Sequence, residues 1–214
     1  MIRIAKSDNK PLSLTTTNAY DGEDVKRQLL LDQQCKCYLC ERKVSTDFQI
    51  DHLKSKQNHP ELRTEWTNLL LSCSYCNPKK GNRFNSILNP IDNDIEDIIE
   101  QRINYSLKAV VFKSNEESQE VQETISLLET IFNGGGVLKR VREEKFYEEV
   151  EAVMNRFNQL IDAYRYNPSK FTEEAVREEL SIDKELLGFK YWIIKTDEVL
   201  SQVFANDIIW NKTA

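Results

Sequence analysis

The chain has 214 residues, of which 30% are charged and 40% hydrophobic, so it is long enough to fold around a sizeable core. No apolar run reaches the roughly 18 residues that a membrane span needs, and no secretory signal is visible, which argues against a membrane protein and favours a reducing cytoplasm. The net charge of −6 argues against a simple nucleic-acid binder.

Charge is distributed unevenly along the chain. The first 90 residues carry more basic than acidic side chains, whereas the remainder is strongly acidic. Between Arg42 and Arg83 there are eight basic residues against four acidic ones. A local excess of this kind governs contact with phosphate, although a solvated surface of mixed charge would look similar. We therefore expect any nucleic acid to approach the first part only, and the acidic remainder to repel it.

The first predicted element is a helix over residues 21–34. Asp21 is its expected N-cap, and Val25 and Leu29 belong to its apolar face. Residues 35–90 differ in character because they hold all five cysteines, both histidines and most of the turn signals. Within them, a short strand is predicted over 48–52.

From Ile91 onward the sequence predicts mainly helices. The expected elements are a short apolar stripe at Ile95, Ile98 and Ile99, a strand over Tyr105–Lys113, a helix over 117–132, a break at 133–136, a long helix from about Val137 to Tyr166, and helices over 173–180 and 184–209 with interruptions near Ser181 and at Gly188. The predicted fold class is α+β and mostly helical. We predict a metal-stapled module over residues 1–92, with its core at 35–90, and an acidic helical interaction domain over 93–214.

The cysteines form two matched pairs. Cys37 and Cys40 make one Cys-x-x-Cys knuckle, Cys73 and Cys76 make the other, and 32 residues separate the knuckles. Two such knuckles can place four thiolates tetrahedrally around one Zn²⁺, and a closed four-thiolate site is structural rather than catalytic. Cys35 could replace Cys37 in this site, or it could be a small core or boundary residue.

The segment between the knuckles carries the residues suited to catalysis. Asp51 and His52 end the predicted strand, where consecutive side chains share a site only if the strand ends or bends. Asn68 follows sixteen residues after His52. Asn77 comes directly after the last cysteine and before Pro78, which places it at the entrance of a predicted helix.

Asp51-His52, Asn68 and the run Cys73 to Lys80, beside the first knuckle, resemble the HNH endonucleases of the ββα-metal fold. Over about residues 35–90 the sequence is most similar to the HNH subunits of Septu-type anti-phage systems, the PtuB proteins, including those attached to retrons. This resemblance implies a zinc-stapled ββα-metal module followed by a helical domain.

Three positions depart from the family pattern. Asn77 stands where many HNH enzymes have a second histidine, and Asp51 stands where this branch often has glutamate. Both changes keep an oxygen or nitrogen ligand. Ser55 replaces the proline that commonly precedes the residue equivalent to Lys56, so the conformation of that loop is left open.

The resemblance assigns a role to each motif residue. It implies that His52 is the general base, that Asp51 and Asn77 bind a catalytic Mg²⁺ or Mn²⁺, and that Asn68 bonds to backbone and orients His52. The predicted phosphate contacts are Lys54, Lys56, Lys79, Lys80 and Arg83.

Two classes of function follow from these residues. The first is a metal-dependent DNA endonuclease, the effector of a Septu-type system, with an ABC-type ATPase (PtuA-like) bound through the helical domain. The second is a non-catalytic, zinc-ribbon-like module that binds nucleic acid or protein. The second explains the cysteines and lysines but gives Asp51 and His52 no task.

Overall fold

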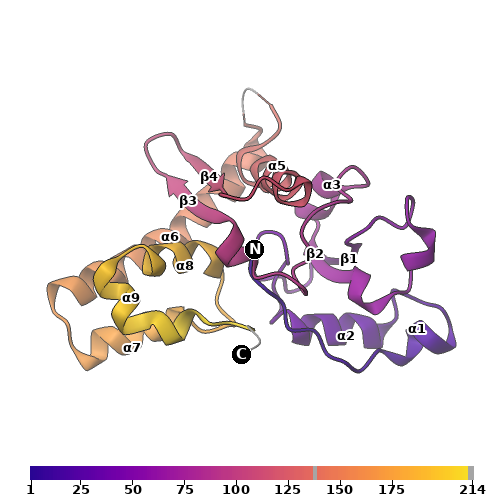
Figure 1. Cartoon of the computed structure of the whole chain (residues 1–214), viewed down its shortest axis with the longest axis horizontal. Coiled ribbons are helices and arrows are strands. Elements are labelled where there is room, and N and C mark those ends of the chain that lie inside the picture. The colour runs from indigo at the N-terminus through magenta and orange to yellow at the C-terminus, as the bar shows by residue number, and fades with distance from the viewer. Residues whose placement is uncertain (137–138, 212–214) are drawn as a thin grey trace.

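A ββα unit lies in the first half of the chain (Figure 1). It consists of β1 (Phe48–His52), β2 (Leu69–Cys73) and α3 (Cys76–Lys80), in a computed structural model that describes residues 1–136 and 139–211. The strands pair antiparallel, with Phe48 opposite Cys73 and His52 opposite Leu69. The elements before and between them are α1 (Leu12–Thr16), α2 (Glu23–Asp32) and the 3₁₀ turns Pro60–Leu62 and Trp66–Asn68.

The second half is mainly helical around a small hairpin. Its elements are α4 (Ile95–Ile98), β3 (Glu100–Asn104), β4 (Ala109–Lys113), α5 (Gln119–Asn133), α6 (Val141–Tyr166), α7 (Lys170–Glu179), α8 (Leu187–Lys195), α9 (Glu198–Phe204) and the 3₁₀ turn Ala205–Ile208. The strands β3 and β4 pair antiparallel. Helix α8 packs on β3, whereas α5 contacts both β4 and α3 (Figure 1). None of the described helices is long and apolar enough to span a membrane.

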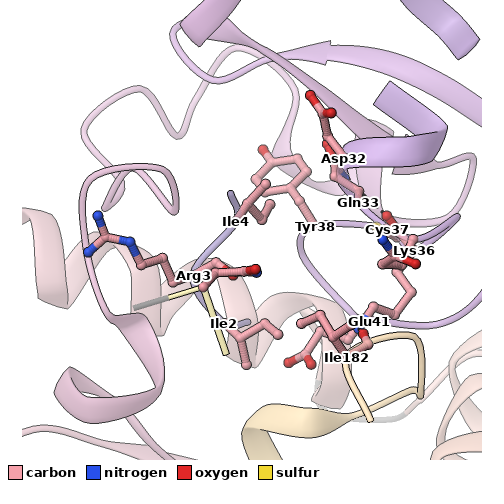
Figure 2. A pocket seen from close by; sticks show the side chains of 12 residues that line it. Ile2, Arg3, Ile4, Asp32, Gln33, Lys36, Cys37, Tyr38, Glu41 and Ile182 are labelled. Carbon is pink, nitrogen blue, oxygen red and sulfur yellow. Dashed lines mark hydrogen bonds between the residues drawn. The ribbon is translucent and has the colours of Figure 1, made fainter. Parts of the chain in front are cut away.

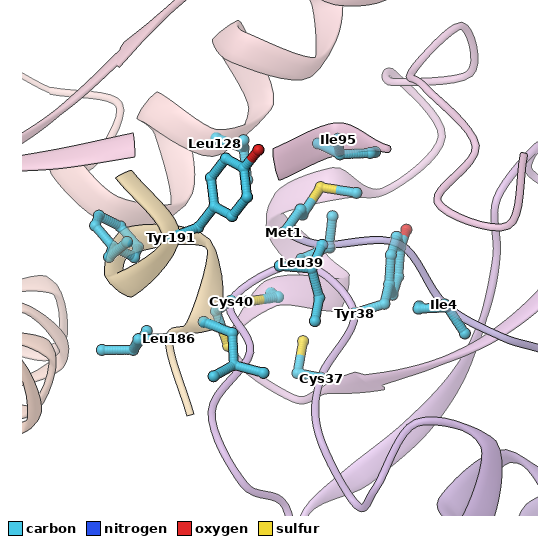
Figure 3. Packing of buried hydrophobic residues seen from close by; sticks show 14 of the residues in the cluster. Met1, Ile4, Cys37, Tyr38, Leu39, Cys40, Ile95, Leu128, Leu186 and Tyr191 are labelled. Carbon is cyan, nitrogen blue, oxygen red and sulfur yellow. The ribbon is translucent and has the colours of Figure 1, made fainter. Parts of the chain in front are cut away.

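Buried residues from both halves meet around the start of the chain. Figure 3 shows Met1 beside Leu39 of the first cysteine knuckle, in one buried cluster with Leu186 and Tyr191 of the helical half. The amino group of Met1 pairs with the Glu41 carboxylate at 2.7 Å. The same carboxylate accepts hydrogen bonds from the backbone N–H of Gly188, at the start of α8. The knuckle is therefore tied to the helical half by apolar packing and by polar bonds.

The same junction contains a small cavity. Figure 2 shows Ile2, Ile4 and Tyr38 on its walls, with Ile182 of the helical half opposite them. The Lys36 ammonium lies at this junction and donates hydrogen bonds to the carbonyl groups of Ile182 and Lys184. These contacts make the loop before α8 part of the wall around the knuckle.

The predicted fold class is confirmed, but one strand prediction was wrong. Residues Tyr105–Lys108 form a turn instead of the first half of a strand, so only β4 remains of the predicted Tyr105–Lys113. Its partner β3 escaped prediction because its buried position is occupied by a polar residue, Gln101. The Gln101 amide accepts from the Met1 amino group and donates to the Met1 carbonyl, so its burial costs no unpaired polar group.

Helix boundaries also differ from the sequence predictions. Gly22, not Asp21, is the N-cap of α2, and the Asp24 carboxylate instead accepts hydrogen bonds from the backbone and hydroxyl of Ser13. Helix α6 begins at Val141, and residues 137–138, where its start was predicted, lie outside the described residues. Gly188 lies inside α8 rather than interrupting a helix, and the last predicted helix breaks between Lys195 and Glu198 instead.

Candidate active site and metal centre

The four cysteines of the two knuckles meet at one point. Cys37 and Cys40 lie in the loop after α2, where Glu41 takes a φ of +57° that turns the chain back on itself. Cys73 ends β2 and Cys76 begins α3, so the second knuckle is the turn between strand and helix. The backbone N–H of Tyr38 donates to the carbonyl of Leu71 at 3.0 Å and fixes the first knuckle against β2.

The arrangement of the thiols fits a single metal ion. Their sulfur atoms all lie within 4.8 Å of one another, and the Cys40 and Cys73 sulfurs are 3.9 Å apart. Burial raises the pKa of the Cys40 and Cys76 thiols, whereas hydrogen bonds from the neighbouring thiols lower the pKa of Cys73. A bound cation would stabilise the thiolate form that burial disfavours. Cys35 lies outside this cluster and is exposed, which leaves it without a place in the metal centre.

His52 is the last residue of β1, and its ring is held in one orientation. Its Nε2 atom lies 2.9 Å from the carbonyl oxygen of Arg63. Because a carbonyl can only accept a hydrogen bond, Nε2 carries the proton and Nδ1 carries the lone pair. Tyr20 packs edge-on against the imidazole, with ring centroids 4.8 Å apart. Burial lowers the pKa of His52, so the ring is neutral at neutral pH and Nδ1 can accept a proton.

Asn68 fixes the loop that holds His52. Its Oδ1 accepts from the backbone N–H of Lys54 at 2.8 Å, and its Nδ2 donates to the carbonyl groups of Lys54 and Leu62. Leu62 directly precedes Arg63, whose carbonyl holds the His52 ring. The amide therefore connects the segment after His52 to the segment that orients the imidazole.

Asp51 points to different partners from those of His52. Its Oδ2 accepts a hydrogen bond of 2.6 Å from the Tyr38 hydroxyl. The Lys80 ammonium lies 3.3–3.4 Å from the two carboxylate oxygens and donates to the backbone carbonyl of His52 at 2.7 Å. Burial raises the pKa of Asp51, against the attraction of Lys80 and the Tyr38 hydrogen bond, which lower it.

These contacts correct the role predicted for Lys80. Its side chain is fully buried between α3 and β1, with its ammonium on Asp51 and the His52 backbone. The prediction that Lys80 contacts phosphate is therefore wrong, because a substrate cannot reach the group. The helical period brings this residue onto the face of α3 that packs against the sheet, three positions after Asn77.

In the structure, the Asp51 carboxylate of the predicted divalent-ion site is engaged by the Tyr38 hydroxyl and the Lys80 ammonium. Within residues 1–136 and 139–211, no hydrogen bond or ion pair joins the side chains of Asp51, His52 and Asn77. Asn77 instead donates to the Gln49 amide oxygen at 2.6 Å. A divalent ion bound to this carboxylate would have to displace the Lys80 ammonium, because the two cations repel each other. The assignment of Asp51 and Asn77 as ion ligands stays a prediction.

The other predicted phosphate contacts remain accessible. Lys54, Lys56 and Arg83 are exposed, and Lys79 is half-buried beside α6. The Lys56 ammonium donates to the Tyr20 hydroxyl at 2.7 Å, so it lies next to the residue that covers the His52 ring. Lys79 pairs with Glu143 at 2.7 Å.

Three residues around the site escaped the sequence analysis. Tyr20 covers His52, Tyr38 binds Asp51, and the Arg63 guanidinium lies 4.8 Å from the Tyr20 ring centroid while its carbonyl holds His52. Tyr20 precedes the 35–90 core of the module in sequence, and Arg63 acts through its backbone carbonyl, so neither residue belongs to a recognisable motif. Only Tyr38 carried a signal, because it lies inside the first knuckle.

Replacing Lys80 by methionine is expected to lower the free energy of unfolding by about 3–5 kcal/mol, because it leaves the buried Asp51 carboxylate without its cation. The double variant Lys80→Met/Asp51→Asn should recover part of this loss. Urea denaturation followed by circular dichroism gives both values, and Lys113→Met, at an exposed position, is the control. A Lys80→Met protein as stable as this control would show that the pair contributes nothing.

The segment that contains both knuckles and His52 is similar to known proteins. Residues 37–83 match the family model described as HNH endonuclease. The Septu protein PtuB of Bacillus thuringiensis is 36% identical over 116 residues, which cover 49% of this chain and 45% of that protein. The chain thus spans somewhat less than half the length of this curated relative. The matched family segment includes both knuckles, Asp51, His52, Asn68 and Asn77.

Proposed function

Because residues 37–83 form an HNH endonuclease domain, we propose that this chain is an endonuclease that hydrolyses DNA phosphodiester bonds with the help of Mg²⁺ or Mn²⁺. The observation that carries this proposal is the His52 ring, which lies inside the matched segment with Nε2 bonded to the Arg63 carbonyl. Its Nδ1 makes no hydrogen bond to any described residue. A neutral imidazole held in this way is suited to remove a proton from an attacking water.

The surrounding residues support this role for His52. Asn68 positions the two backbone segments next to the imidazole. The Tyr20 ring packs edge-on against the imidazole. Lys56 and Arg63 both place their cationic groups within 5 Å of the centroid of the Tyr20 ring, which in turn contacts the His52 ring. Positive side chains at this position can hold a phosphodiester near Nδ1 without reading its sequence.

We propose zinc as the ion of the four-cysteine centre. Tetrahedral zinc with Zn–S bonds of about 2.3 Å places neighbouring sulfurs roughly 3.8 Å apart, close to the 3.9 Å between Cys40 and Cys73. Four thiolates leave no open coordination position, so this ion has a structural role. It would hold the turn between β2 and α3 against the first knuckle, and with it the end of β1 that carries His52.

A role in Septu-type anti-phage defence, under control of an ABC-type ATPase, is the proposed biological setting. The resemblance to a Septu protein supports it. The helical half is the proposed partner-binding part, and two exposed aromatic residues near its α6–α7 turn, Tyr166 and Phe171, support a protein contact there. The cytoplasm is the proposed location.

The proposed activity is tested by incubating the purified chain with supercoiled plasmid, alone and with its ATPase partner, in Mg²⁺, Mn²⁺ or Ca²⁺. We expect nicked or linear DNA in Mg²⁺ or Mn²⁺ and little product in Ca²⁺, because calcium binds oxygen ligands with a different, looser geometry. DNA binding without cleavage under every metal, with the partner present, would favour the alternative of a non-catalytic zinc-ribbon-like module.

A further inference from the structure

A basic groove runs between the HNH module and the start of α6. It consists of two adjacent hollows of about 270 and 420 Å³ that share Tyr75 and Arg142 on their walls. The HNH module contributes Arg42, Lys43, Lys79 and Arg83. The segment around the start of α6 contributes Arg140, Arg142 and Lys145. The groove thus combines cations from two parts of the chain that are far apart in sequence.

Acidic residues neutralise only part of this charge. Three acidic side chains line the groove, against seven basic ones. Glu143 pairs with Lys79 and Glu149 pairs with Arg42, while Lys145 pairs with Glu148. In the part of the chain that the structure describes, Arg83, Arg140 and Arg142 form no ion pair. Unpaired guanidinium groups along an open groove are suited to a ligand with several separate negative charges, such as a run of phosphates.

Aromatic packing holds the HNH side and the α6 side of the groove in fixed positions relative to each other. The Tyr75 ring stacks on Phe146 of α6 with centroids 4.4 Å apart and planes 14° from parallel. The Lys79 ammonium and the Arg142 guanidinium lie 5.0 and 5.5 Å from the Tyr75 ring centroid. The Tyr75 hydroxyl donates to the carbonyl of Ile131 at the end of α5. Cations from both parts of the chain are therefore positioned before any ligand arrives, which lowers the entropic cost of binding.

We infer that the basic groove binds the phosphate backbone of duplex DNA, so that α6 extends the DNA contact beyond the HNH module. This inference rests on the proposed function, in which DNA is the substrate. It also changes the expectation, drawn from charge alone, that nucleic acid approaches only the first part of the chain. The second half is acidic as a whole, but its segment around the start of α6 presents basic side chains to the HNH module, where Arg140 and Arg142 line the same hollow as Lys79 and Arg83.

A structural role for these cations makes a different prediction. Four thiolates around a divalent ion carry a net charge of −2, and Cys73 lines one end of the groove. If Arg142 only balanced that charge, its loss would lower metal content and stability, with no effect on the salt dependence of DNA binding. Metal content and the salt dependence therefore separate the two roles.

The test compares the double variant Arg140→Gln/Arg142→Gln with the full-length wild-type chain. Fluorescence anisotropy with a labelled DNA duplex, at several salt concentrations and without Mg²⁺ or Mn²⁺, gives the affinity and its salt slope. We expect about a tenfold weaker affinity and a log–log slope smaller by about 2, because each lost phosphate contact removes roughly 0.9 from the slope. The matched control is Arg27→Gln/Arg156→Gln, which removes the same charge from two exposed positions elsewhere.

The outcomes separate the groove from the proposed activity. Binding by the double variant with the wild-type affinity and slope would overturn the inference, and cleavage by the wild-type chain would leave the proposed function standing. A wild-type chain that binds no duplex would also overturn it. An RNA duplex forms a second arm, and binding of RNA in preference to DNA would assign the groove to a different ligand. If both double variants weakened DNA binding equally, the effect would come from the net charge of the protein and not from the groove, which would also overturn the inference.

Discussion

Replacing His52 by alanine is expected to lower the rate of DNA cleavage by about 10²–10⁴-fold, the usual contribution of a positioned general base. The imidazole has one nitrogen bonded to the Arg63 carbonyl and the other free of described partners, so the ring is held with Nδ1 able to accept a proton. The rate is measured on supercoiled plasmid, in the metal ion that supports the highest wild-type activity.

His59→Ala is the matched control for this experiment. His59 is the other histidine of the chain, and its ring pairs with Glu61 in an exposed loop after the site. We expect this variant to retain wild-type cleavage, and both variants to retain the bound metal and the circular dichroism spectrum of the wild type. Wild-type cleavage by the His52→Ala protein would remove the imidazole from the reaction and favour the non-catalytic module.

Replacing Cys40 by serine is expected to release the metal ion and unfold the module around the knuckles. Apparent binding free energies of structural zinc in small domains are about 10–16 kcal/mol, which equals or exceeds the total stability of most domains. The Cys40 sulfur is buried within the cluster, and among the described residues the cluster contains only the four cysteines, so the loss of one leaves three thiolate ligands. Metal content per chain and loss of far-ultraviolet circular dichroism measure the effect.

Cys35→Ser provides the control for the metal centre, because Cys35 lies in the same loop but is exposed and outside the cluster. We expect it to bind one ion per chain and to change the free energy of unfolding by no more than about 0.5 kcal/mol. Metal loss in Cys35→Ser, together with retention in Cys40→Ser, would mean that the cluster as described does not hold the ion.

The metal centre and the ββα unit could be predicted from short-range pattern. A Cys-x-x-Cys spacing forms a tight knuckle in any fold, and two knuckles flanking a strand signal leave few ways to bury four thiols other than around an ion. The strand at Phe48–His52 and the helix after Cys73 followed from alternation and from Pro78. These features depend on residues close together in the chain.

The partners of the site residues could not be predicted in the same way. Lys80 is expected at the surface because lysine is seldom buried without a partner, and its partner Asp51 lies 29 positions earlier in the chain. Gln101 broke the apolar pattern of β3 because its amide is paired with Met1, 100 positions away. A side chain that pairs across such a distance leaves no local signal.

The chemical groups of the site could be read from the order of residues alone: four thiols at metal-binding spacing, a histidine beside a carboxylate, and an excess of basic residues between Arg42 and Arg83. Which of these groups face each other depends on the packing of the folded chain. It turned Lys80 inward onto Asp51, covered His52 with Tyr20, and brought Arg142 from α6 to Tyr75 beside α3. The physical reason is that burial and pairing depend on how distant segments pack, whereas spacing and composition are local.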